Sequence, residues 1–154
     1  MCGLPGSGKS TWIKDRINKY GGKHISRDEI RFSMLSEEDE YFANENKVFN
    51  EFVRRANEAI ANDNILDVYI DATHLSRGSR AKIRKELKLT GYAGLFIAVY
   101  FDVPAEICKA RNRMRTGREL VPDSVIDNMT KGLTKPTYGF DEVWTIDFEG
   151  RRLS

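Results

Sequence analysis

The stretch Gly3-Leu4-Pro5-Gly6-Ser7-Gly8-Lys9-Ser10, close to the beginning of a chain of 154 residues, decides the fold. It satisfies the pattern G-x-x-x-x-G-K-[ST], and a run with helical spacing of apolar residues follows it at once. Glycine in these positions permits a tight backbone turn, so that successive N–H groups and a helix N-terminus can converge on phosphate oxygens. The pattern therefore predicts a phosphate-binding loop.

In such a loop the lysine and the last hydroxyl have separate tasks. Lys9 would supply positive charge to the β- and γ-phosphates of ATP, and the hydroxyl of Ser10 would bind Mg²⁺. Thr11 is placed to reach the α-phosphate. The residues predicted to contact ATP around the loop are Gly6, Ser7, Gly8, Lys9, Ser10 and Thr11.

Beyond the loop, apolar runs alternate with amphipathic runs in the order of βαβ units. This order predicts an α/β fold with a mainly parallel sheet that is covered by helices on both faces, a three-layer sandwich. The length suits one domain, residues 1–154. Expected strands cover 23–26, 65–70, 94–101 and 143–146, and expected helices cover 11–20, 44–61, 76–89, 105–114 and 122–133.

The composition indicates a globular protein. Hydrophobic residues make up 40% and charged residues 31% of the chain, which argues against disorder. No stretch approaches the roughly 18 apolar residues that span a bilayer, and no signal peptide opens the chain. We expect a cytoplasmic protein without a membrane partner. Cys2 and Cys108 lack metal-ligand spacing and are expected to be reduced thiols that pack as small apolar residues.

The net charge of +2 conceals an uneven distribution. Residues 28–67 hold eleven acidic and four basic side chains, whereas residues 77–118 hold eleven basic and three acidic ones. If the basic half forms one face, that face can attract polyphosphate. The alternative is that most of these charges lie on solvated helix faces.

The beginning of the chain does not fit the pattern. A phosphate-binding loop normally follows a buried central strand of about five residues, yet only Met1 and Cys2 precede Gly3. Either the fold has a very short first strand, or apolar residues belong upstream of Met1. We expect the second, and the encoding DNA upstream of Met1 would test it.

Asp28 is the first candidate on the acceptor side. It follows the expected strand 23–26, at the strand end where open α/β sheets carry out their chemistry. Phosphoryl transfer needs a group that orients the attacking hydroxyl and takes its proton, and a carboxylate near the γ-phosphate meets that need. Arg31 lies three residues later and would hold an acceptor phosphate. The alternative is that Asp28 is only a helix N-cap and Arg31 only part of a surface ion pair.

Several motifs in the same order resemble the polynucleotide 5′-hydroxyl kinases of phages and bacteria. The matching stretches fall in order across residues 3–140, a span that covers most of the chain. They are Gly3 to Trp12, Ser26-Arg27-Asp28-Glu29-Ile30-Arg31, Ile70-Asp71-Ala72-Thr73-His74-Leu75, Phe101-Asp102-Val103-Pro104 and Arg111-Asn112-Arg113-Met114-Arg115-Thr116-Gly117-Arg118.

The resemblance implies a P-loop kinase domain with a small arginine-bearing lid over residues 111–121. Asp28 would be the general base toward the 5′-hydroxyl, and Arg31 would hold the phosphate on the 3′ side of the acceptor nucleoside. Arg115 would be the catalytic lid arginine on the ATP phosphates, together with Lys9. Independently of the resemblance, Arg111, Arg115 and Arg118 would share one face if the preceding helix continued that far.

The resemblance also places Asp71 and Thr73 near the acceptor. Asp71 would reach Mg²⁺ through water, or it would only organise Thr73 and the adjacent loop. His74 stands where the family often has Asn and is interpreted as a polar loop residue. His24 is expected to be structural, and Trp12 to belong to the core.

The resemblance does not extend to every part of that family. No second acidic motif or second domain is present, so we expect neither a 3′-phosphatase nor a ligase activity. The main hypothesis is ATP-dependent phosphorylation of RNA or DNA 5′-ends, as in nucleic acid repair. One alternative is a P-loop kinase for a small molecule or a tRNA-linked hydroxyl, and another is a nucleotide-dependent switch. A homo-oligomer is left open because no apolar stripe marks an interface.

Overall fold

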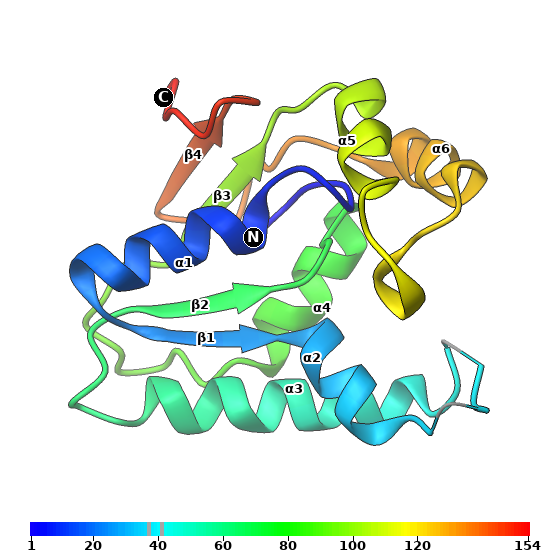
Figure 1. Cartoon of the computed structure of the whole chain (residues 1–154). Helices are drawn as coiled ribbons and strands as arrows, with labels where there is room; N and C mark the ends of the chain where they lie inside the picture. Colours follow the sequence, from blue (N-terminus) through cyan, green and yellow to red (C-terminus); the bar gives the residue numbers. More distant parts are fainter. Residues whose placement is uncertain (37, 41) are drawn as a thin grey trace.

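The computed structural model describes residues 1–36, 38–40 and 42–154. Strands alternate with helices along the chain (Figure 1). The first half contains α1 (Lys9–Tyr20), β1 (Lys23–Ser26), α2 (Arg27–Met34), α3 (Glu45–Ile60) and β2 (Val68–Asp71). The second half contains α4 (Arg77–Glu86), β3 (Ile97–Phe101), α5 (Ala105–Asn112), the 3₁₀ turn η1 (Gly117–Glu119), α6 (Asp123–Gly132) and β4 (Glu142–Ile146).

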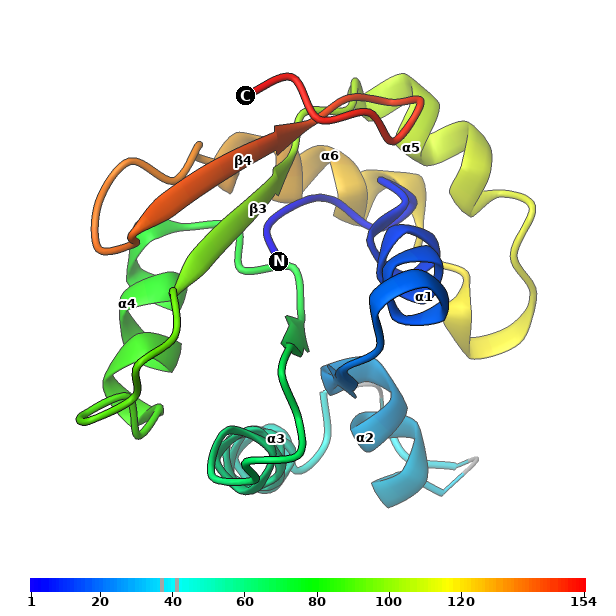
Figure 2. The same cartoon turned by 90° about the vertical axis from the view of Figure 1, so that its left-hand side faces the viewer.

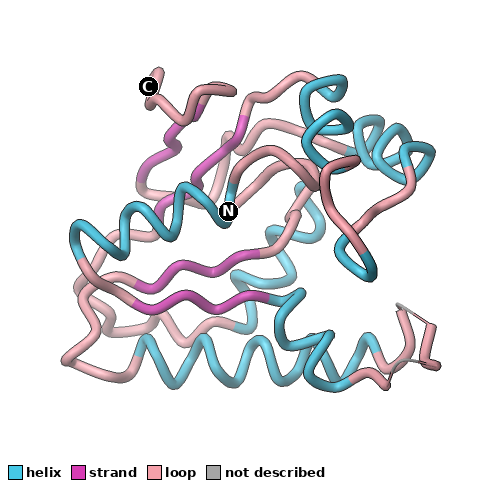
Figure 3. The backbone as a smooth tube through the Cα atoms, in the orientation of Figure 1, coloured by secondary structure: helices cyan, strands magenta, loops and turns pink. Residues whose placement is uncertain are grey.

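The strands form two parallel pairs. β1 pairs with β2, with Ser26 opposite Asp71, and β3 pairs with β4, with Phe101 opposite Ile146. Figure 3 shows the two pairs as separate strand segments on either side of the chain's beginning. The predicted α/β fold with a mainly parallel sheet is confirmed.

Residues 1–3 join the two pairs. On one side the Met1 nitrogen donates to the Ile70 carbonyl (2.9 Å) and the Gly3 N–H to the Thr73 carbonyl (3.0 Å). On the other side Cys2 forms a parallel bridge with Tyr100. The Cys2 N–H donates to the Val99 carbonyl oxygen, and the Phe101 N–H donates to the Cys2 carbonyl oxygen, both at 2.8 Å. The order across the sheet is therefore β1, β2, residues 1–3, β3, β4.

A cavity of about 160 Å³ lies beside residues 1–3, between β2 and β3. Its walls are mostly apolar side chains of the two strands, of α1 and of α4, such as Ile70, Ala98, Trp12 and Ile83. Apolar cavities of this size forfeit dispersion contacts between their walls. None of residues 3–10 is among the residues that line the cavity.

Helices cover both faces of the strands, and Figure 2 shows α1 on one side and α4 on the other. One buried cluster unites α3 and α4 with the first strand pair around Phe52, which is fully buried. A second cluster unites α5 and α6 with the second pair around Phe101 and Ile126. Trp12 packs at this second cluster, with its ring edge-to-face against Tyr69, Phe101 and Trp144.

Local sequence accounts for most element ends. Ser26, in extended backbone, accepts a hydrogen bond from the Glu29 N–H and caps α2, so Asp28 is not the N-cap. Ser76 caps α4 in the same way through the Ser79 N–H. α5 ends at Asn112, two residues earlier than expected, and residues 113–121 form a loop with one 3₁₀ turn.

In the part of the chain that the structure describes, no helix is long and apolar enough to span a bilayer.

Candidate active site

The phosphate-binding loop lies at the carboxyl ends of β1 and β2, where α1 begins. Gly8 caps α1 with φ 94°, and Gly6 has φ 79°, a backbone region that favours glycine. A Cβ added to Gly6 would lie 2.3 Å from the Cys108 carbonyl oxygen of α5, so the loop also needs glycine for close packing. The residues predicted to cradle phosphate therefore form a tight turn at a helix N-terminus.

Lys9 folds back over this loop. Its ammonium group donates to the carbonyl oxygens of Gly3 (3.1 Å) and Leu4 (2.8 Å) and to the Ser7 hydroxyl (3.4 Å). Burial lowers the pKa of Lys9, and the negative charges of Asp71 and Asp28 oppose that shift. Both predicted carboxylates thus lie within electrostatic reach of the lysine that would contact the ATP phosphates.

Asp71 and Ser10, the two residues expected around magnesium, lie in contact. The Ser10 hydroxyl donates to the buried Asp71 carboxylate at 3.1 Å, and His24 Nε2 contacts the same oxygen at 3.0 Å. Burial alone would raise the pKa of Asp71, but the hydrogen bond from His24 and the charge of Lys9 lower it overall. A hydroxyl beside an ionised carboxylate is the oxygen donor set that Mg²⁺ prefers, so Ser10 and Asp71 would hold the ion.

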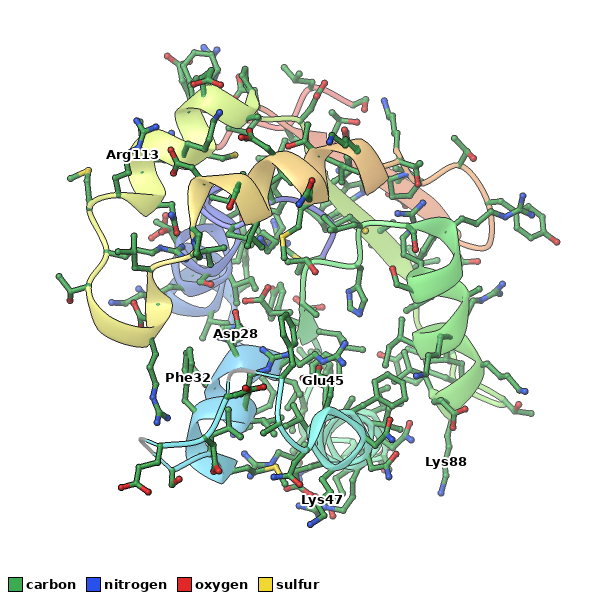
Figure 4. The ribbon with its side chains drawn as sticks, turned by 90° about the vertical axis from the view of Figure 1, so that its right-hand side faces the viewer. Asp28, Phe32, Glu45, Lys47, Lys88 and Arg113 are labelled. Atoms are coloured by element: carbon green, nitrogen blue, oxygen red, sulfur yellow. The ribbon has the colours of Figure 1, made fainter. Side chains whose placement is uncertain are left out.

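Asp28 begins a carboxylate and guanidinium network on the acceptor side. Its side chain is 64% exposed and pairs with the guanidinium of Arg31, whose side chain is only 6% exposed. Arg31 also donates to Glu45 of α3, through Nε at 3.2 Å and Nη2 at 2.8 Å, and Arg27 pairs with the same carboxylate. Figure 4, which looks onto this end of the molecule, shows Asp28 and Glu45 close together above α2.

Glu45 is a site residue that the motifs did not indicate. Burial would raise the pKa of Glu45, but hydrogen bonds and charge from Arg31 and Arg27 lower it overall. Nothing in the spacing of residues 28–45 shows that α3 begins against α2, so no sequence signal identifies Glu45. His24 was likewise expected to be structural only, although strand alternation places it on the same side of β1 as Ser26.

The lid arginines approach the phosphate-binding loop from α5 and the segment after it. The Arg111 guanidinium lies 3.7 Å from the position of an added Gly8 Cβ and donates to the Phe148 carbonyl at 2.6 Å. The charge of exposed Arg115 is among those that lower the pKa of Lys9. Both predicted ATP-binding arginines therefore lie near the loop.

The three arginines do not share a helix face, because α5 ends before Arg115. Arg118 instead donates to the carbonyl oxygens of Leu35 and Ser36, just after α2. It thus ties the lid to the acceptor side. Asn112 fixes the base of the lid, since its buried amide exchanges hydrogen bonds with the backbone of Val121.

The segment after β2 contains Thr73 and His74, two further residues of the stretches that resemble polynucleotide kinases. Thr73 is partly buried and its carbonyl oxygen accepts from the phosphate-binding loop at Gly3. His74, interpreted as a polar loop residue, lies in this loop and is buried, with φ 42°. Its Nδ1 donates to the Met1 carbonyl oxygen at 3.0 Å, so Nδ1 carries the proton. Burial is the main cause that lowers the pKa of His74 to about 3.

The fold and the phosphate-binding loop together define a P-loop kinase domain, a class of ATP-dependent phosphotransferases that use Mg²⁺. The chain belongs to the AAA domain family, whose model matches residues 1–136. That family does not confirm the finer resemblance to polynucleotide kinases.

Solved structures of small-molecule kinases share the fold. A gluconokinase from Sinorhizobium meliloti has a TM-score of 0.60 at 19% identity, over 96% of this chain and 79% of that one. An unliganded sugar kinase from Janibacter sp. has a TM-score of 0.62 at 19% identity, over 97% and 84%. A deoxyadenosine kinase from M. mycoides with bound dATP has a TM-score of 0.51 at 16% identity, over 96% and 89%.

Proposed function

We propose that this protein transfers the γ-phosphate of ATP to a hydroxyl group of a small molecule. The observation that carries the proposal is the position of Asp28. It follows the carboxyl end of β1, its side chain is largely exposed, and its charge reaches Lys9. A carboxylate there can accept the proton of an attacking hydroxyl next to the transferring phosphoryl group.

The other residues of the site would then bind and orient. The N–H groups at Gly8 and Lys9 would hold phosphate oxygens at the start of α1. Lys9 and the lid arginines Arg111 and Arg115 would offset the negative charge of the γ-phosphate during transfer. Mg²⁺, held by Ser10 and Asp71, would neutralise charge on the phosphates.

The surroundings of Arg31 support a small-molecule acceptor. Its guanidinium group donates to Glu45 in bidentate fashion and also pairs with Asp28. A nucleic acid phosphate bound by Arg31 would have to compete with two carboxylates, and it would be repelled by both of them. The printed names of the neighbours, a gluconokinase, a sugar kinase and a deoxyadenosine kinase, point in the same direction.

A second candidate acceptor is the 5′-hydroxyl end of RNA or DNA. The spacing of Asp28 and Arg31 favours it, because the two side chains meet at the acceptor side as the resemblance to polynucleotide kinases implies. In that case the acceptor phosphate would displace Asp28 or Glu45 from Arg31, and a nucleic acid repair role would follow.

The test is transfer of ³²P from γ-labelled ATP with Mg²⁺ to two acceptor panels. One panel contains sugars, sugar acids and nucleosides, and the other contains 5′-hydroxyl RNA and DNA oligonucleotides. Each assay includes Asp28→Asn, which removes the base but keeps the shape of the side chain. Asp15→Asn is the matched control, because Asp15 is an exposed carboxylate on α1.

We expect labelled product from the small-molecule panel, lost in Asp28→Asn and kept in Asp15→Asn. If label appears only on the oligonucleotides, the acceptor is a nucleic acid 5′-end and the small-molecule proposal is wrong. ATP binding without any labelled acceptor would favour a nucleotide-dependent switch, and full transfer by Asp28→Asn would mean that another group is the base.

A further inference from the structure

A groove of about 610 Å³ lies between α4 and the segment that links α6 to β4. Basic residues dominate its walls, and no acidic residue lines it. In Figure 4, α4 (green) and the linking segment (orange) lie on the side opposite the lid (yellow), so the groove is separate from Asp28 and the lid. The lining residues that the argument uses are Arg77, Arg80, Arg84, Lys85, Lys135 and Tyr138.

The cationic side chains of the groove lack acidic partners. Arg77, Arg84, Lys85 and Lys135 are all exposed, and within the described ranges none of them forms an ion pair. Elsewhere the exposed basic side chains Arg54, Arg113 and Arg151 do pair with carboxylates. Four like charges around one groove repel one another unless an anion lies between them.

The groove also has a rigid floor and an aromatic wall. Buried Arg80 donates to the carbonyl oxygens of His74, Leu75 and Thr134, which fixes the linking segment against α4. Tyr138 is 77% exposed, and the Arg77 guanidinium lies 5.5 Å from the centre of its ring. Exposure of the apolar ring of a tyrosine to water is unfavourable, and the free ring face can stack on another planar group.

We propose that this groove binds single-stranded nucleic acid. Cations at several points of a groove suit a chain of phosphates, and an exposed aromatic ring beside them suits a base, which is the combination that binds single strands without sequence preference. A polymer of carboxylates would satisfy the charges but would leave Tyr138 unused. The inference does not depend on which acceptor the kinase site phosphorylates.

The experiment measures fluorescence anisotropy of a short oligo(dT) that carries fluorescein on its 5′-end, without ATP. The label blocks the terminal hydroxyl, so the signal does not require phosphorylation. The groove variant is Arg84→Glu with Lys85→Glu. The matched control is Lys47→Glu with Lys88→Glu, an equal charge change on residues outside the groove lining that Figure 4 labels away from it.

We expect the groove variant to weaken binding about tenfold or more and to reduce the slope of log K against log salt by about 1.4, or about 0.7 for each lost phosphate contact. Tyr138→Ala should weaken binding without changing that slope. The control pair should retain the parent affinity.

Equal losses in the groove and control variants would overturn the proposal, because binding would then follow net charge alone. Absence of binding by the parent at low salt would also overturn it. Poly-glutamate or vesicles with anionic lipid are competitors in the same assay. Stronger binding of either one than of oligo(dT) would assign the groove to that partner instead.

Discussion

At the scale of single residues, burial and local charge determine which groups of the site are ionised. Asp71 and Glu45 have lowered pKa values because cationic neighbours outweigh the effect of burial. Lys9 has a lowered pKa because burial outweighs its carboxylate neighbours. The site thus holds fixed carboxylates around a lysine that is already largely desolvated, which strengthens its interaction with a phosphate.

His74 provides a test at this scale. Its pKa is about 3 in the folded protein against 6.5 for an ordinary histidine. Below about pH 6.5 the unfolded chain therefore binds a proton that the folded chain does not. The free energy of unfolding should fall as the pH falls from about 6.5 toward 3, by at most about 1.4 kcal/mol per pH unit from this group.

Urea denaturation at several pH values in this window would measure the slope, with His74→Asn as the comparison. Asparagine tolerates the positive φ of this position, so the variant removes the titrating group without new backbone strain. We expect the parent to lose more stability than the variant as the solution is acidified. Parallel curves would show that His74 is protonated in the folded protein as readily as in the unfolded one.

At the scale of elements, the lid depends on where α5 ends. Asn112 closes α5 and fixes the lid base to Val121, which releases Arg115 from the helix and leaves it exposed near the phosphate-binding loop. Arg118 then attaches the far side of the lid to the end of α2. The lid therefore connects the phosphate side of the site with the acceptor side.

Arg115→Ala tests this element. The guanidinium group would offset charge on the transferring phosphoryl group, so its loss should lower turnover by about 10³-fold, by analogy with arginine fingers. Because Arg115 is exposed, thermal unfolding should stay near that of the parent. Steady-state kinetics with saturating ATP and acceptor would measure the effect.

Arg113→Ala is the matched control for the lid. Arg113 lies two residues earlier and points outward from the end of α5, where it pairs with Asp123 (Figure 4). Its loss should leave turnover close to that of the parent. Similar losses in both variants would mean that general lid charge, and not the position of Arg115, supports transfer.

At the scale of the whole molecule, residues 1–3 connect the two strand pairs. The β1 and β2 pair and the β3 and β4 pair share no direct ladder, and Met1, Cys2 and Gly3 supply the hydrogen bonds between them. The site spans this junction, because Asp28 follows β1 and Asp71 ends β2, whereas the lid follows β3 and α5. The stability of the junction thus affects how the two halves of the site face one another.

Cys2→Pro tests the junction. Proline removes the Cys2 N–H that donates to the Val99 carbonyl and leaves that buried acceptor unsatisfied, so the free energy of unfolding should fall by about 2–3 kcal/mol. Cys2→Ala keeps the backbone bonds and separates this effect from loss of the buried side chain. Equal urea midpoints for the two variants would show that the junction contributes little to stability.

The class of fold, the phosphate-binding loop and the approximate extent of most elements could be predicted from the amino-acid sequence alone. These features depend on local chemistry: glycines that permit a tight turn, serines that cap helices, and alternating apolar runs. The positions of Lys9, Ser10 and Asp28 follow from their places at the ends of strands and the start of a helix. The roles of Asp28, Arg31 and Arg115 and the acceptor class remain predictions.

Only the tertiary structure decided which distant side chains meet. Glu45 reaches Arg31 because α3 packs against α2, and His24 reaches Asp71 because β1 lies beside β2. The burial of His74 and the groove beside α4 likewise arise from packing of segments that are far apart in the chain. Such contacts depend on where whole elements pack in space, which local spacing along the chain does not determine.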